Sequence, residues 1–283
     1  MAQQAADWPI LLAGTLLLRP YVFVFLAAFL VLAARDLGWR RTWGWLGWGW
    51  TVAYVAEYAS TRIGFPFGLY HYTGETAWRE LFVSNVPFFD PLSFPFLAYA
   101  SYCLARWALG QARGWAPAAL TGVLMMLLDV VVDPLAVRGE SWFLGRVFYY
   151  AEPGTYFGVP LSNFVGWFLV GWVIVGGYLW AAGRRPQALG SPLGGIGLYC
   201  GVLLFNLGMT GWIGEGALLG AGILVHVAVF LLVYALKAIS VTRGWTDERP
   251  AGERVAVITT TIDERGHQAN ERAGFPEDRK SVV

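Results

Sequence analysis

Three carboxyl side chains lie in stretches of this sequence that are otherwise apolar. Glu57 follows the apolar run 43–56, while Asp129 and Asp133 lie in the run 127–134. A spacing of four places Asp129 and Asp133 on one face of a helix, one turn apart. Ionisable groups are costly inside a membrane span, and where they occur they mark functional sites. We therefore take these three residues as candidate catalytic acids and bases.

These carboxyl groups suit acid–base chemistry on an apolar substrate. Burial and a like-charged neighbour both favour the neutral form of a carboxyl group, so one member of a close pair keeps its proton near neutral pH. Such an acid can protonate an alkene, and aromatic ring faces can stabilise the resulting carbocation as they do other cations. The sequence has no phosphate-binding loop, dinucleotide fingerprint, histidine cluster or nucleophile elbow. We therefore expect neither a cofactor nor a metal site.

The composition is typical of a polytopic, all-α membrane protein. Of the 283 residues, 57% are hydrophobic and 14% are charged, whereas about a quarter are charged in soluble domains. Apolar runs reach about 20 residues, the length that crosses a bilayer core as a helix. The period-2 alternation of a membrane barrel is absent. The net charge is +1, so nothing indicates nucleic-acid binding.

About seven apolar segments are long enough to be transmembrane helices. Arg19 and Pro20 interrupt the first, which is either one kinked helix or an interfacial piece to Leu18 followed by a membrane helix from Pro20. The fourth is expected to stop at Asp133, because Pro134 disfavours helix in the residue before it. The predicted spans are 10–34, 42–61, 89–108, 116–132, 160–182, 193–212 and 217–239.

The distribution of arginines predicts how this helix bundle is oriented. The connectors after the first, third and fifth spans contain arginines, and basic connectors face the cytoplasm. The N-terminus is then outside the cell and the C-terminus inside. We expect an integral, multi-pass protein of the plasma membrane, with its helical membrane domain at 1–240. The mixed-charge segment 241–283 is predicted to be a flexible cytoplasmic tail.

Helix direction predicts that the polar residues of the spans gather at one membrane face. Successive spans run in opposite directions, so the ends of the second, fourth and sixth lie with the starts of the third and fifth. The aromatic loops 62–88 and 135–159 would roof a polar pocket there. The residues that this counting brings together are Glu57, Asp90, Asp129, Asp133, Asn163 and Asn206.

Structural roles are the alternative for several of these residues. Glu57 can form an ion pair with Arg62 at the membrane interface. Asp133 can be a helix-end residue before its proline. Asp90 is predicted to be the N-cap of the third span. Hydrogen bonding between helices is the alternative for Asn163 and Asn206.

Three motifs carry a family resemblance: Glu57-Tyr58-x-Ser60-Thr61-Arg62-x-Gly64-x-Pro66-x-Gly68-x-Tyr70, Asp129-x-x-x-Asp133-Pro134 and Gly154-x-x-x-Gly158-Val159-Pro160-x-x-Asn163-Phe164-x-Gly166-Trp167. Together they resemble the CruF-type carotenoid biosynthesis proteins, from about Arg19 to Tyr234. The resemblance implies a carotenoid 1,2-hydratase, which adds water across the terminal double bond of an acyclic ψ end group. The implied substrates are lycopene- or γ-carotene-like carotenoids, or a C50 bacterioruberin precursor. No cofactor is implied.

For this reaction we expect the polyene to lie among the helices with one end in the outer pocket. A protonated carboxyl, Asp129 or Asp133, would give its proton to C2, and the tertiary cation would form at C1. Glu57, oriented by the hydroxyls that follow it or by Arg62, would deprotonate the attacking water. Substrate contacts are expected from Tyr58, Arg62, Tyr70, Asn163, Trp167 and Asn206.

Two other functions remain open. Another carotenoid end-group enzyme, such as a cyclase, would share the acid but exclude water. A seven-helix pigment-binding protein or a transporter would carry out no chemistry. Lys237 lies at the cytoplasmic end of the last span, which argues against a retinal-type Schiff base. The expected partners are the carotenoid substrate, membrane lipid and other enzymes of the carotenoid pathway, with no nucleic acid.

Overall fold

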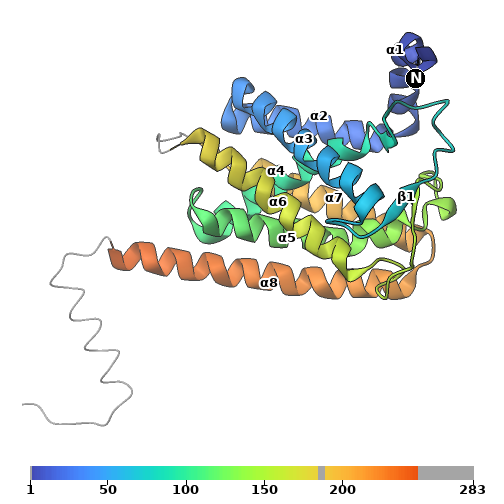
Figure 1. Ribbon diagram of the computed structural model, residues 1–283. Helices are drawn as coiled ribbons and strands as arrows, with labels where there is room; N and C mark the ends of the chain where they lie inside the picture. Colours follow the sequence, from blue (N-terminus) through green and yellow to red (C-terminus); the bar gives the residue numbers. More distant parts are fainter. Residues whose placement is uncertain (1, 184–188, 248–283) are drawn as a thin grey trace, which may run out of the picture. The chain divides into compact units, whose positions relative to one another are not determined.

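The computed structural model describes residues 2–183 and 189–247, with side chains described for 7–183 and 189–242. The chain divides into two units after Ala238, and the residues discussed below belong to the first. The described chain is mostly helical, which confirms the predicted class (Figure 1). The predicted tail at 241–283 lies largely outside the described residues. The helices are α1 (Ala2–Leu18), α2 (Pro20–Leu37), α3 (Trp39–Ile63), α4 (Asp90–Leu109), α5 (Trp115–Ala136), α6 (Leu161–Ala182), α7 (Leu193–Trp212) and α8 (Gly216–Asp247).

Within the described residues, five helices are long and apolar enough to cross a membrane: α2, α5, α6, α7 and α8. α3 and α4 have 25 and 20 residues, a sufficient length, but they are not among these five. α3 also carries four ionisable side chains, which lower its hydropathy: Arg40, Arg41, Glu57 and Arg62. Seven crossings and the orientation of the termini therefore stay predictions.

The first apolar run is two helices and not one. α1 ends at Leu18 and α2 begins at Pro20. Proline fits the first position of a helix because the amide there has no intrahelical acceptor. Arg19 lies between the helices, with a non-helical φ of −123° and ψ of 45°. Of the two alternatives for this run, the one with a separate helix from Pro20 is confirmed.

The expectation that the fourth span stops at Asp133 is wrong. α5 runs past Pro134 to Ala136. Proline in a helix removes a backbone donor, but the carbonyl groups at this end receive other donors. Arg138 Nη1 donates to the carbonyl oxygen of Pro134 at 2.8 Å. Trp142 Nε1 donates to the carbonyl oxygen of Leu135 at 3.2 Å. The Val137 amide donates to the Asp133 carbonyl oxygen at 2.9 Å, so Asp133 lies inside the last turn of the helix.

α4 is the central helix of the unit. It contacts α2, α3, α5, α6 and α7, and most of its side chains are buried (Figure 1). Indole groups of α3 fix that helix to its neighbours: Trp45 Nε1 donates to the carbonyl oxygen of Pro95 in α4 at 2.9 Å. Trp48 Nε1 donates to the carbonyl oxygen of Ile174 in α6 at 3.0 Å. This packing fixes the position of α3 relative to α4 and α6, which carry Asp90 and Asn163.

Short strands pair the two long loops. β1 (Tyr70–Tyr72) runs antiparallel to β4 (Phe148–Tyr150), with Tyr70 opposite Tyr150 and Tyr72 opposite Phe148. Successive side chains of a strand point to opposite faces, so these four rings share one face of the pair. Tyr70 contacts Tyr150 edge to face, with ring centroids 5.9 Å apart. The loops also contain a hairpin, β2 (Phe82–Val83) with β3 (Val86–Pro87), and a 3₁₀ turn at Gly139–Ser141.

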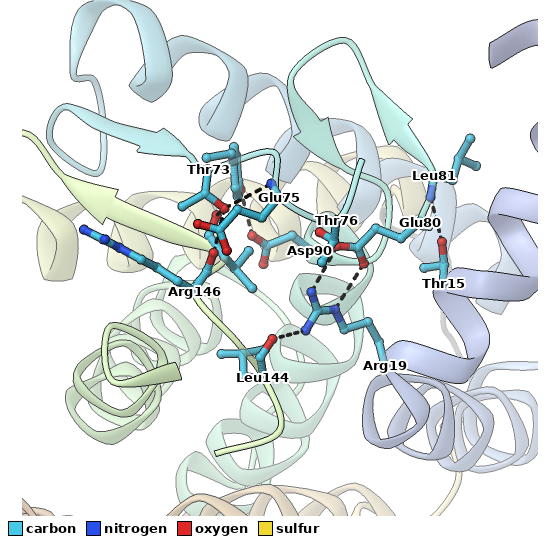
Figure 2. Close-up of polar contacts among 12 residues, drawn as sticks. Thr15, Arg19, Thr73, Glu75, Thr76, Glu80, Leu81, Asp90, Leu144 and Arg146 are labelled. Atoms are coloured by element: carbon cyan, nitrogen blue, oxygen red, sulfur yellow. Dashed lines mark hydrogen bonds and ion pairs between the residues drawn. The ribbon is translucent and has the colours of Figure 1, made fainter. Parts of the chain in front are cut away.

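A buried ion pair holds the same loops to the start of α2. Arg19 donates through Nε and Nη2 to the carboxylate of Glu80 at 3.1 and 3.0 Å, and the exposed fractions of the two side chains are 2% and 0%. Arg19 Nη1 also donates to the carbonyl oxygen of Leu144 in the second loop (Figure 2). Thr76 donates to Glu80 as well. One guanidinium therefore joins the α1–α2 junction to both loops.

We predict that Glu80→Ala destabilises the protein by about 3–5 kcal/mol, because it leaves the Arg19 guanidinium buried without its counter-charge. The matched control is Glu140→Ala, whose partner Arg146 lies 3.9 Å away and is 51% exposed. Exposed pairs contribute about 0–1 kcal/mol. Unfolding midpoints measured in detergent, by heat or by denaturant, test the difference. Equal midpoints for Glu80→Ala and Glu140→Ala would contradict the prediction.

Candidate active site

A cavity of about 120 Å³ lies beneath the paired loops. Its wall is formed by α2 to α7 together with β1 and β4, and is mostly aromatic and aliphatic. The structure thus brings together, at one cavity, polar residues that lie far apart in the sequence. The carboxyl and amide groups on the wall belong to Glu57, Asp90, Asp133, Asn163 and Asn206.

One pair of carboxyl groups is bridged by a tyrosine. The Tyr72 hydroxyl oxygen lies 2.8 Å from Glu57 Oε2 and 2.7 Å from Asp90 Oδ2. A hydroxyl group has one proton and donates only one hydrogen bond. The second short contact therefore needs a proton on one of the carboxyl groups. We call the carboxyl groups of Glu57 and Asp90, with Tyr72 between them, the tyrosine-bridged pair. Its proton is shared between α3 and α4.

A second pair of carboxyl groups is bridged by an asparagine. Asn163 Nδ2 lies 2.6 Å from Asp129 Oδ2 and 2.7 Å from Asp133 Oδ2, and an amide nitrogen has one proton for each. Asp133 lines the cavity, whereas Asp129 is fully buried behind it. Asp129 Oδ1 has no hydrogen-bond partner among the described residues. We call Asp129, Asn163 and Asp133 the asparagine-bridged pair; it joins α5 to α6.

A layer of tyrosines from the loops lies between the two pairs. The Tyr150 hydroxyl donates to Asp133 Oδ2 at 3.3 Å, and the hydroxyls of Tyr70 and Tyr72 are 3.5 Å apart. Burial, reinforced by the nearby carboxyl groups, raises the pKa of Tyr70, Tyr72 and Tyr150 well above the usual range. These hydroxyls therefore stay protonated at physiological pH. They act as neutral donors and not as bases.

Aromatic rings form another part of the cavity wall. Phe94 of α4 stacks on Trp167 of α6, with centroids 4.3 Å apart and planes 12° from parallel. Phe67 from the first loop packs against both rings. Its position requires glycine at 166, because a Cβ there would lie 2.5 Å from the Phe67 ring. The glycines of the sequence motifs thus allow a loop to approach α6 and complete an aromatic surface.

The structure separates the predicted site residues into those at the cavity and those outside it. Tyr58 and Arg62 do not line it. The Arg62 guanidinium stacks 3.3 Å from the Tyr58 ring centre and donates to Asn85 at 2.9 Å, so it holds the first loop. Glu57 has Tyr72, and not Arg62, as its hydrogen-bond partner. The predicted residues that line the cavity are Glu57, Asp133, Tyr70, Asn163, Trp167 and Asn206.

Two residues of the site were not among the predicted catalytic or substrate-binding residues. Asp90 was predicted to lie in the polar pocket, and it does; the expectation that it caps the third span is wrong. The cap position is Phe89, which makes no side-chain cap hydrogen bond, while Asp90 Oδ2 lies 2.7 Å from the Tyr72 hydroxyl oxygen. Tyr72 shares a strand face with Tyr70, so the period-2 pattern Tyr-His-Tyr was the signal in the sequence. Only the pairing of the loops shows which face meets the carboxyl groups.

Among the described residues, no group of three or more His, Cys, Asp or Glu side chains could hold a metal ion. The four carboxyl groups lie instead in two hydrogen-bonded pairs, and three of the four line an apolar cavity. This arrangement suits proton transfer to and from an apolar molecule.

Comparison with known proteins shows which family this chain belongs to. A family model described as carotenoid biosynthesis protein matches residues 16–236. The chain is 33% identical over 182 residues to the bisanhydrobacterioruberin hydratase of Haloarcula japonica. That alignment covers 61% of this chain and 59% of the relative, so the chain spans less than two thirds of the relative's length. No solved structure matches the chain. The family match includes every residue that lines the cavity.

We predict that Tyr72→Phe destabilises the protein by about 1–3 kcal/mol, because the two carboxyl groups lose the hydroxyl that lies within hydrogen-bond distance of both. Tyr149→Phe is the matched control, since Tyr149 lies on the opposite face of the paired loops and is 42% exposed. Thermal unfolding in detergent should show a lower midpoint for Tyr72→Phe alone. Equal unfolding midpoints for Tyr72→Phe and Tyr149→Phe would refute the bridging role.

Proposed function

Because this chain belongs to the carotenoid biosynthesis protein family, we propose that it is a carotenoid hydratase. It adds water to the terminal C1–C2 double bond of an acyclic ψ end group. The observation that carries the proposal is the pair of proton-sharing carboxyl sites on one aromatic cavity. The name of the Haloarcula japonica relative supports water as the second reactant. The substrate is a lycopene- or γ-carotene-like molecule or a C50 bacterioruberin precursor.

The asparagine-bridged pair is the acid of the proposed reaction. Two buried carboxyl groups held by one amide avoid repulsion when one of them keeps a proton. Asp133 lies at the cavity and gives that proton to C2, while Asp129 and Asn163 fix its position. A new C–H bond forms at C2, the π bond breaks, and the positive charge develops at C1.

Aromatic rings stabilise that charge. A cation on a ring face is attracted by the quadrupole of the ring, by about 2 kcal/mol or more where bulk water is excluded. Phe67, Phe94 and Trp167 present such rings to the cavity. They also lack any group that could capture the cation, so a positioned water is the nucleophile.

The tyrosine-bridged pair is the base. Water forms the C–O bond at C1 and gives one proton to Glu57, which Tyr72 holds in place. The neutral tyrosines lie between the two pairs: Tyr72 contacts Glu57, Tyr150 donates to Asp133, and the rings of Tyr70 and Tyr150 are in contact. One proton leaves the acid and one reaches the base, so return of a proton between the pairs resets the site. No other reactant is needed.

The chemistry fits a membrane setting. The five long apolar helices suggest an integral membrane protein, and carotenoids dissolve in lipid. We propose the seven crossings, external N-terminus and plasma-membrane location for this chain. The site then lies toward the outer face. Membrane lipid and other enzymes of the carotenoid pathway are its proposed surroundings.

Expression in bacteria that make lycopene or γ-carotene tests the activity. We predict a new, more polar pigment heavier by one water, detected by liquid chromatography with mass detection. A product of unchanged mass would identify a cyclase. If neither these pigments nor a C50 precursor change while the protein is present in the membrane, the chain has no hydratase activity on them.

Substitution of the carboxyl groups tests the assigned roles. We predict that Asp133→Asn and Glu57→Gln each lower kcat by about 10²–10⁴-fold, the usual contribution of a general acid or base. Asp129→Asn should also stop turnover, because it removes the proton-sharing partner of Asp133. Glu140→Gln, at an exposed loop carboxylate, is the matched control and should retain wild-type turnover. Normal turnover by Asp133→Asn and Asp129→Asn would remove this pair from the mechanism.

A further inference from the structure

We propose that the polyene enters the cavity sideways, through a seam between α2 and α7, while the loops over the carboxyl groups stay closed. This inference rests on the hydratase function proposed above. The aromatic seam, defined by Tyr21, Phe25 and Phe205, is then the part of the site that selects a linear polyene.

The size of the cavity requires an exit for most of the substrate. Pockets that enclose a drug-sized ligand usually measure about 300–1,000 Å³, whereas this cavity measures about 120 Å³. It therefore has room for an end group and not for a whole carotenoid. The rest of the polyene has to pass through one wall.

The loop side of the cavity is the most strongly closed. β1 and β4 are joined strand to strand, and the buried Arg19–Glu80 ion pair fixes one loop to α2. The same guanidinium binds the carbonyl oxygen of Leu144 in the other loop (Figure 2). Separating a buried charge pair is costly, so a polyene is not expected to pass there.

The wall formed by α4 and α6 is thick. Phe94, Leu97 and Trp167 line it, and their exposed fractions are 3%, 3% and 5%. α4 is surrounded by five other helices. A polyene leaving through this wall would have to displace a complete layer of packed helices.

The wall formed by α2 and α7 consists of aromatic rings, and Trp142 and Phe143 of the second loop pack against Tyr21, with centroids at 6.1 and 5.7 Å. Phe205 of α7 packs against Tyr21 and Phe25, one turn apart on α2, with centroids at 5.3 and 5.7 Å. All three rings line the cavity, and all three are only half-buried. Their neighbours Val24 and Leu204 are 65% and 66% exposed. The seam therefore has the cavity on one side and the outer surface of the bundle on the other.

Nothing polar fastens this seam. No hydrogen bond or ion pair joins α2 to α7 in the part of the chain that the structure describes, and both helices are candidate membrane spans. The outer surface of the seam then faces lipid, where carotenoids dissolve. Ring contacts can rearrange without leaving a polar group unpaired.

The seam also indicates the class of substrate. A conjugated polyene is flat and apolar, so it can lie between ring faces. Only the acyclic end reaches the carboxyl groups, and the remainder lies in the seam and the lipid. The site therefore accepts C40 and C50 chains with the same end group and does not depend on the structure of the far end.

Filling the seam tests the route. Gly201 of α7 is half-buried, and a Cβ there would lie 4.0 Å from Phe25 Cε1. Gly201→Phe should raise KM for the carotenoid by about tenfold or more with little change in kcat, the pattern of weakened uniform binding. Leu204→Phe, which faces outward, is the matched control and should match the wild type. In an Asp129→Asn background, Gly201→Phe should also lower the amount of pigment that copurifies with the protein.

Closing the loops tests the alternative route. His71 and Tyr149 are opposite each other in the β1–β4 pair and point away from the rings that line the cavity. A disulfide between cysteines introduced by His71→Cys and Tyr149→Cys should leave turnover unchanged. Loss of turnover on oxidation, with recovery on reduction, would place the entrance at the loops and overturn the proposal.

The outcomes distinguish a failure of the proposed entry route from a failure of the proposed hydratase function. If the wild type forms no hydrated product from any carotenoid, the proposed function fails. If the wild type is active and Gly201→Phe matches it in KM and in retained pigment, the seam proposal alone fails. A rise in KM for Gly201→Phe but not for Leu204→Phe, with an active disulfide variant, supports the seam.

Discussion

A carboxyl group removed from water needs a hydrogen-bond donor or a proton of its own, and one end of this bundle is built around that requirement. Four carboxyl groups lie there, and helix packing alone provides a donor for only two of them. Asn163 serves Asp129 and Asp133 across the α5–α6 contact. Glu57 and Asp90 depend on Tyr72, which comes from a loop.

The loops are therefore part of the site and not only a cover. Tyr72 reaches the carboxyl groups only because β1 pairs with β4 in the register that puts Tyr70 opposite Tyr150. A shift of one residue would turn His71 toward the cavity and the tyrosines away from it. Arg19 limits such shifts, because it holds both loops at once. The buried ion pair thus protects the hydrogen bonds of the carboxyl groups.

The sequence predicted helices, their approximate bounds and the meeting of polar residues at one end, because these follow from apolar length and alternating direction. It could not predict contacts that depend on tertiary packing. The rule for residues before proline failed at Asp133, where the backbone hydrogen bond from Val137 keeps α5 helical past Pro134. The partner of Glu57 was sought among its neighbours on α3, whereas Tyr72 approaches from a strand fifteen residues later. Asp90 was assigned to its own helix end because the sequence does not show that a loop tyrosine lies beside it.

The separation of the two carboxyl pairs explains how an acid site can favour hydration. A cation formed beside a single carboxylate would return its proton to that group, and the alkene would re-form. Here the proposed acid lies on α5 and the proposed base on α3, on different parts of the cavity wall, with neutral tyrosines between them. The base can then hold a water against the far side of the cation, while the rings of Phe94 and Trp167 offer no competing nucleophile. Addition of water becomes the available outcome because the groups that give and take the proton are held apart by the fold.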